Sequence, residues 1–180
     1  EALIRIESIP GSASERFMRI AVINDDMPFL VDSIAGAVAA HGIAVDRLIH
    51  PVLAVRRDAG GVLTAIVAGE AAGERRESLV YLETRRGDAR ARRALESALK
   101  STLADVKVAV ADWPRMQAAM AADADTLADS EGAALLRWFQ GGALTQLGHV
   151  TRRRDGSQDN ALGICKRSAR TLLGAISWER

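Results

Sequence analysis

The sequence has few of the residues that cross-link a chain, cross a membrane or attract nucleic acid. Cys165 is its only cysteine, so no disulfide can form within the chain, which is typical of a reducing, cytoplasmic compartment. No apolar run approaches the roughly 20 residues of a membrane-spanning helix. The 24 basic and 23 acidic residues nearly cancel. Composition therefore gives no reason to expect a membrane or nucleic acid as partner.

The motifs that bind metals and cofactors are also absent. The three histidines, His41, His50 and His149, lie in different segments and have no metal-ligand spacing. The chain contains no Gly-rich dinucleotide turn, no phosphate-binding loop and no Cys-x-x-Cys pair. No sequence signature surrounds Cys165, so a buried, inert thiol is the favoured interpretation. The sequence predicts no catalytic residue, no metal site and no cofactor site in these residues.

What is present is a core-forming pattern of strands and helices. Apolar residues make up 48% of the chain, enough for a packed core. Residues 16–24 alternate as a strand that is apolar on both faces, which predicts a central strand covered on both sides. Apolar residues then recur at helical spacing from Leu30 to His41, and Gly42 is placed to end that helix. Pro51 interrupts the extended segment that follows, and the "DAGG" turn at 58–61 predicts a hairpin.

The remaining elements complete a two-layer α+β arrangement. Residues 78–85 read as a strand, Asp88 is placed to cap a helix, and residues 105–113, "DVKVAVADW", alternate as another strand. The order predicts a ferredoxin-like βαββαβ fold over residues 1–112. A connector helix is expected over 113–130. Residues 131–180 contain a helix at 131–139 and two strands at 144–154 and 161–167, the start of a second, incomplete α/β unit.

The loop from Asn24 to Phe29 is the one acidic, turn-forming segment between a strand and a helix. Asp25 and Asp26 are either helix N-caps or metal ligands. Capping is favoured because no histidine or further acid stands at ligand spacing. The arginine pairs, such as Arg56-Arg57 and Arg75-Arg76, alternate with acids and are read as solvated, salt-bridged faces. An RNA-binding αβ module remains a distant alternative, with Phe17 and Tyr81 as its stacking residues.

Four stretches in order resemble the N-terminal region of the large bacterial NAD-specific glutamate dehydrogenases. They are "VINDDMPFLVDSI", "LIHPVLAVRRD", "ESLVYLETRR" with "VAVADWPRM", and "LLRWFQGGALTQLGH". The stretch "DDMPFLVDSIAGAVAAHGIAV", from Asp25 to Val45 between two strands, also resembles ACT domains, which sense amino acids. ACT domains that bind amino acids usually have Gly after the loop proline, where this chain has Phe29. The resemblance implies an ACT-type module over 1–112 and a PAS-type unit after it.

The resemblance implies a regulatory and oligomer-forming segment of an oxidoreductase. Its parent enzyme would convert L-glutamate, NAD and water into 2-oxoglutarate, ammonia and NADH, with NAD bound elsewhere in the parent chain and the segment itself non-catalytic. Glu1 in place of Met agrees with a piece of a longer chain. The expected ligand-binding residues are those of the loop: Asn24, Asp25, Asp26, Met27, Pro28 and Phe29. The expected partners are the parent chain, other copies and an amino-acid effector. A stand-alone amino-acid-sensing module is the alternative.

Overall fold

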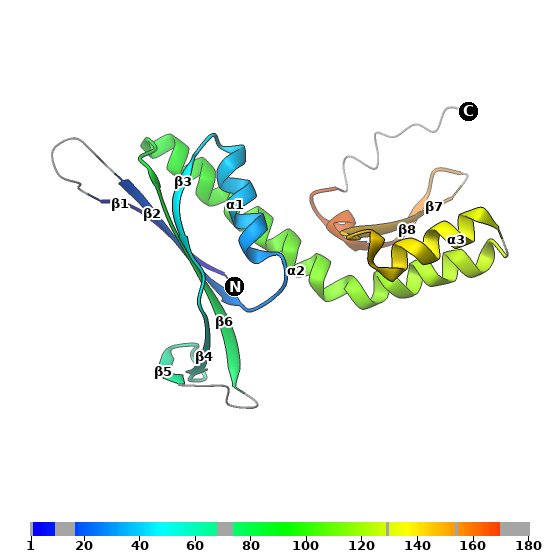
Figure 1. Cartoon of the computed structure of the whole chain (residues 1–180), viewed down its shortest axis with the longest axis horizontal. Helices are drawn as coiled ribbons and strands as arrows, with labels where there is room; N and C mark the ends of the chain where they lie inside the picture. The colour runs from blue at the N-terminus through cyan, green and yellow to red at the C-terminus, as the bar shows by residue number, and fades with distance from the viewer. Residues whose placement is uncertain (1, 10–16, 68–73, 129, 154, 170–180) are drawn as a thin grey trace. The chain divides into compact units, whose positions relative to one another are not determined.

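The computed structural model describes residues 2–9, 17–67, 74–128, 130–153 and 155–169 (Figure 1). The chain divides into two compact units, Glu1–Leu103 (unit 1) and Ala104–Arg180 (unit 2). One long helix, α2 (Ala89–Thr126), contributes its first part to unit 1 and its second part to unit 2.

Unit 1 is built on an antiparallel sheet that has six strands within the described residues (Figure 1). The strands are β1 (Leu3–Ile9), β2 (Phe17–Asp25), β3 (Val45–Ile49), β4 (Val52–Arg57), β5 (Leu63–Val67) and β6 (Arg75–Arg85). The order is β1-β2-β6-β4-β5, and β3 also pairs with β6. β4 and β3 pair with successive parts of β6, and Pro51 lies between them. The predicted interruption at Pro51 and the predicted hairpin of β4 and β5 are confirmed.

The core of unit 1 lies on one face of this sheet. Met18, Ile20 and Val22 of β2 are buried, as are the residues opposite them on β6. Helix α1 (Leu30–Ala40) and the first part of α2 lie over this face and bury their own apolar side chains on it, namely Leu30, Ile34, Val38, Leu95 and Leu99 (Figure 1). β2 is central, as predicted, but Arg19 on its other face is exposed. The prediction that β2 is covered on both sides is wrong.

The strand predicted over residues 105–113 is also wrong, because these residues continue α2. Three valines alternate there, yet Val106, Ala109 and Asp112 are the buried residues. Their three-residue spacing extends the buried stripe of the preceding helical turns, and that longer 3.6-residue period prevails over a local β-preference. Pro114 lies inside the helix. The βαββαβ order is therefore not formed, and the fold is a mixed α+β arrangement with an antiparallel sheet.

The sheet position beside β2 is filled by β1, which is not among the predicted elements. β1 pairs antiparallel with β2, from Leu3 opposite Ile23 to Ile9 opposite Phe17. Ile4 and Ile6 are half-buried while Leu3, Arg5 and Glu7 are exposed. This alternation is the pattern of a strand covered on one face.

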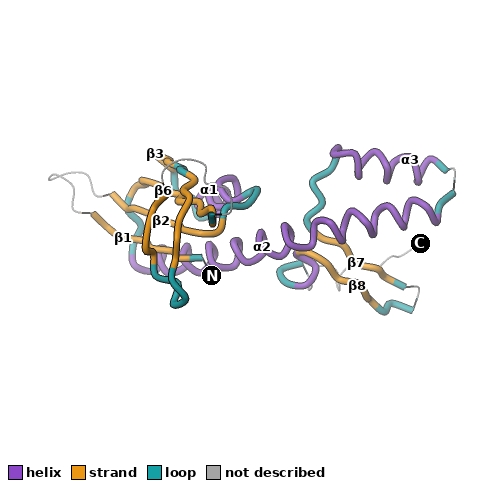
Figure 2. The backbone as a smooth tube through the Cα atoms, turned by 90° about the horizontal axis from the view of Figure 1, so that it is seen from below, coloured by secondary structure: helices purple, strands orange, loops and turns teal. Residues whose placement is uncertain are grey.

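Unit 2 contains the second part of α2, α3 (Glu131–Trp138), and a hairpin of β7 (Gly148–Arg152) and β8 (Gln158–Gly163). Ser130 caps α3, its hydroxyl accepting a hydrogen bond from the Ala133 amide. The predicted helix is confirmed. The predicted hairpin forms with other bounds, because residues 144–147 are not strand, β8 begins at Gln158, and Ile164–Lys166 form a 3₁₀ turn. Figure 2 shows these elements by type. Within the described residues, none of the helices combines the length and apolar character that crossing a bilayer requires.

Candidate functional site

The loop from Asn24 to Phe29 connects the end of β2 to the start of α1. Helix α1 begins at Leu30, and the residue before it, Phe29, has φ 69° and ψ 3°. This left-handed conformation is uncommon for a bulky residue, and the Phe29 ring is 45% exposed. Met27 is half-buried and Pro28 is exposed. Phe29 thus takes a backbone conformation that glycine adopts without a steric penalty.

Neither acid of the loop caps α1, so the capping prediction is wrong. The residue at the cap position is Phe29, and no side chain there accepts a hydrogen bond from the first turn. Three residues separate Asp26 from the helix, and its backbone amide still bonds to the Arg76 carbonyl of β6 at 3.0 Å. Both carboxylates are therefore directed at β6 instead of the helix.

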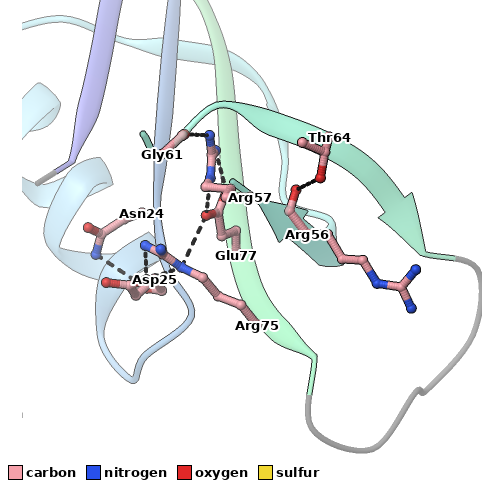
Figure 3. Close-up of polar contacts among 8 residues, drawn as sticks. All are labelled: Asn24, Asp25, Arg56, Arg57, Gly61, Thr64, Arg75 and Glu77. Carbon is pink, nitrogen blue, oxygen red and sulfur yellow. Dashed lines mark hydrogen bonds and ion pairs between the residues drawn. The ribbon is translucent and has the colours of Figure 1, made fainter. Parts of the chain in front are cut away.

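Asp25 begins a chain of charged contacts that runs across the end of the sheet (Figure 3). Its Oδ1 lies 2.9 Å from Arg75 Nε and 2.5 Å from Arg75 Nη2. Arg75 Nε also lies 3.2 Å from Glu77 Oε1. Glu77 in turn accepts two hydrogen bonds from Arg57, from Nε and Nη2, each 2.7 Å long. Arg57 Nη1 donates to the Gly61 carbonyl at 2.8 Å.

Glu77 is the buried member of this chain. Its side chain is 7% exposed, against 24% for Arg57. The hydrogen bonds from Arg57 lower the pKa of the Glu77 carboxyl below its ordinary value of 4.5, although burial acts in the opposite direction. A lowered folded-state pKa means that Glu77 stabilises the fold above the unfolded pKa and loses this contribution on acidification. The contacts at this end of the sheet thus depend on a charged Glu77.

Asp26 belongs to a second, shorter chain of contacts. Its Oδ1 accepts a hydrogen bond of 2.6 Å from the Ser78 hydroxyl, and Arg76 Nε lies 3.6 Å from Oδ2. His50 Nε2 lies 3.1 Å from the same hydroxyl. Because the Ser78 proton is directed to Asp26, the Ser78 oxygen is the acceptor and His50 Nε2 is the donor. His50 is therefore held by a hydrogen bond to β6.

The sequence missed the partners of the loop on β6 and β4. Arg57, Arg75, Glu77 and Ser78 stand 28 or more positions from the loop in sequence, and only the strand register places Asp25 opposite Glu77. The one available signal was the arginine pairs. Their interpretation as salt-bridged faces is confirmed for Arg56, Arg57, Arg75 and Arg76.

The site holds charged groups of both signs. The described residues contain no group of three or more His, Cys, Asp or Glu side chains able to hold a metal ion. Cys165, the one thiol, lies in unit 2. There it is half-buried, and burial raises its pKa. The loop and β6 thus place carboxylates and guanidinium groups side by side.

Comparison with known proteins identifies the family. Residues 10–99 match the family model described as glutamate dehydrogenase, ACT1 domain. The chain belongs to that family. The matched range runs from before β2 into α2 and contains the whole loop together with Arg57, Arg75 and Glu77. The ACT1 domain thus coincides closely with unit 1, without β1.

Two relatives carry the match beyond the ACT1 domain. An NAD-specific glutamate dehydrogenase of Pseudomonas aeruginosa is 40% identical over 102 residues, which cover 55% of this chain and 6% of the relative. An enzyme of the same name from Halomonas elongata is 31% identical over 168 residues, which cover 81% of this chain and 10% of the relative. This second match must extend into unit 2, because unit 1 is little more than half the chain. The chain spans about a tenth or less of the length of these relatives.

Proposed function

We propose that this chain is a regulatory segment of a cytoplasmic NAD-dependent glutamate dehydrogenase. The observation that carries the proposal is the match of residues 10–99 to the ACT1 domain, since ACT domains are regulatory. In this proposal the parent chain binds NAD and oxidises L-glutamate to 2-oxoglutarate and ammonia, while the segment is non-catalytic. Unit 2 is the start of a PAS-type module that follows the ACT1 domain.

The proposed effector site is the loop of Asn24, Asp25, Asp26, Met27, Pro28 and Phe29. An amino acid carries an ammonium and a carboxylate, and the loop brings Asp25 next to Arg75 and Asp26 next to Arg76. Asp25 and Arg75 are 44% and 53% exposed, so both charges are accessible to a small zwitterion. Charge-assisted hydrogen bonds to both ends of the ligand would supply its orientation.

Calorimetric titration of the chain with L-amino acids and with NAD tests this function. We expect saturable binding of an amino acid, its loss in Asp25→Asn, and its retention in Asp46→Asn, a matched charge change on β3. NAD should give no saturable isotherm. Absence of binding by every amino acid tested would contradict the effector site, and micromolar NAD binding would contradict the non-catalytic role.

Self-association is the second part of the proposal, supported by an exposed sheet edge. In the described residues β3 hydrogen-bonds to β6 alone, and its Val45, Leu48 and Ile49 are 37%, 38% and 49% exposed. A second copy can add to this edge antiparallel, about a twofold axis perpendicular to the sheet, placing Val45 opposite the partner's Ile49. The stripe of Ala35, Gly36, Ala39 and Ala40 on α1 offers the alternative contact, since its last three residues are exposed.

Sedimentation across a wide concentration series distinguishes these contacts. Leu48→Lys should abolish association through the β3 edge, whereas Ala40→Lys should abolish association through α1. The variant that leaves association intact serves as control for the other. A monomeric mass at every concentration would remove this part of the proposal.

A further inference from the structure

The loop of the ACT1 domain and the turn between β4 and β5 are joined by one continuous set of side-chain contacts. Asp25 contacts Arg75, Arg75 contacts Glu77, Glu77 accepts from Arg57, and Arg57 donates to the Gly61 carbonyl (Figure 3). The turn is closed by Asp58, whose backbone and side chain accept hydrogen bonds from the amides of Gly60, Gly61 and Val62. Two segments that are distant in sequence are thus joined by one series of ionic contacts.

Two atoms in this series of contacts, Arg75 Nε and Glu77 Oε1, each contact two other residues. Arg75 Nε carries a single proton, yet it lies 2.9 Å from Asp25 Oδ1 and 3.2 Å from Glu77 Oε1. Glu77 Oε1 also accepts from Arg57 Nε at 2.7 Å. Asp25 and Glu77 therefore compete for the single Arg75 Nε proton. The guanidinium groups of Arg75 and Arg57 share Glu77 Oε1, which can accept from both, but their like charges repel each other there.

We propose that Arg75 and Glu77 couple the loop to the turn, so that a cationic group that engages Asp25 loosens the turn at 58–62. A ligand ammonium at Asp25 would displace the Arg75 guanidinium, which then turns to Glu77 Oε1. The hydrogen bonds from Arg57 to Glu77 then weaken. Arg57 no longer keeps the orientation in which its Nη1 donates to the Gly61 carbonyl. The ligand step rests on the effector site proposed above, whereas the coupling is a property of the domain alone.

Amide hydrogen exchange of Gly60, Gly61 and Val62 tests the coupling without any ligand. Asp25→Asn removes the competing charge and should speed exchange at the turn about threefold to fivefold, the size expected of a partly exposed ion pair. Asp26→Asn is the matched control, because Asp26 contacts Ser78 and Arg76 and takes no part in the contacts that run from Asp25 to Gly61. It should leave exchange at the turn within about twofold of the unmodified protein.

Arg75→Gln gives the decisive result, because the proposal gives Arg75 two roles. Arg75 links Asp25 to Glu77, and once released from Asp25 it weakens the hydrogen bonds of Arg57 to Glu77. Its removal should leave the turn closed and should abolish the effect of Asp25→Asn in the double variant. Glu77 is retained in all of these proteins, so the buried carboxylate is not disturbed. Unchanged exchange at the turn in Asp25→Asn would overturn the coupling, as would an equal effect in Asp26→Asn or in the Arg75→Gln background. Failure of the effector site alone would appear in the titrations and leave these exchange rates as expected.

Discussion

The two units use carboxylates in opposite ways. In unit 1 the charges at the end of the sheet are spread over Asp25, Asp26 and Glu77, whose arginine partners range from 24% exposed for Arg57 to 56% exposed for Arg76. In unit 2 one carboxylate, Asp112, is 10% exposed and serves three partners. Unit 1 therefore distributes its charges over several carboxylates, whereas unit 2 gathers Gly163, Lys166 and Arg115 on one.

Asp112 holds the end of β8 against α2. Its Oδ2 accepts a hydrogen bond of 2.9 Å from the Gly163 amide and lies 2.5 Å from Lys166 Nζ, and Arg115 lies 3.3 Å from Oδ1. Gly163 has φ 57° and ψ −138°. A Cβ on Gly163 would lie 2.2 Å from the Leu147 carbonyl oxygen. The contact between β8 and α2 therefore needs the Asp112 carboxylate and also a glycine at position 163.

Gly163→Ala should give the largest loss of unfolding free energy, and the loss should be confined to unit 2. The added Cβ meets backbone at a conformation that L-residues rarely adopt, so we expect a loss on the order of 3 kcal/mol in unfolding free energy. Gly156→Ala is the control, because Gly156 also has a positive φ but an added Cβ there meets nothing within 4 Å. The control should cost about 1 kcal/mol. Urea unfolding followed by tryptophan fluorescence reports on unit 2, since all three tryptophans follow residue 103 in sequence, and Trp113 and Trp138 lie in the described part of that unit. Equal losses in the two variants would show that the collision does not matter.

Substitution of Asp112 should destabilise unit 2 to an extent that depends on pH. Asp112→Ala leaves the Gly163 amide and Lys166 without their acceptor and should cost about 2 kcal/mol. Asp112→Asn keeps an acceptor oxygen and should cost less. The same fluorescence measurement applies, now repeated between pH 3 and pH 7, roughly spanning the carboxyl titration range.

The sign of that pH dependence follows from the contacts of Asp112. The hydrogen bond with Lys166, and then that from Gly163, lowers the pKa of the Asp112 carboxyl from its ordinary value of 3.8. Its stabilisation is therefore present above the unfolded pKa and is lost as the pH falls through the folded one. Asp112→Asn should have a flatter profile in acid. A profile parallel to that of the unmodified protein would contradict the role of the carboxylate charge.

Substitutions of Phe29, in unit 1, should give the smallest of the three changes in stability. Phe29→Gly and Phe29→Ala both remove the half-exposed ring, but only glycine relieves the left-handed backbone. We expect the glycine variant to be more stable than the alanine variant by about 1 kcal/mol, the reverse of the order within regular helices and strands. Circular dichroism melts of the two proteins provide the measurement. Alanine equal to or above glycine would mean that the loop relaxes to a negative φ.

The sequence predicted the elements whose burial follows a local period. β2, α1 and β6 each show one uninterrupted pattern, and Asp88 is confirmed as a cap, since its carboxylate accepts a hydrogen bond of 2.7 Å from the Ala91 amide. Gly42, with φ 68°, follows α1 as predicted. Residues 105–113 were assigned wrongly because two periods coexist there, and only the continuation of the buried stripe from the preceding turns distinguishes them.

The amino-acid sequence by itself determined the α+β class, the family resemblance and the position of the acidic loop, because each depends on residues close together in the chain. The tertiary structure decided what the loop acids contact. Asp25 and Asp26 are suited to capping a helix by type, but the antiparallel register of β2 and β6 places Arg75, Glu77 and Ser78 beside them. The register follows from the apolar alternation of both strands and from the turns that join them, so the residues of the loop alone do not reveal which side chains of β6 lie beside them.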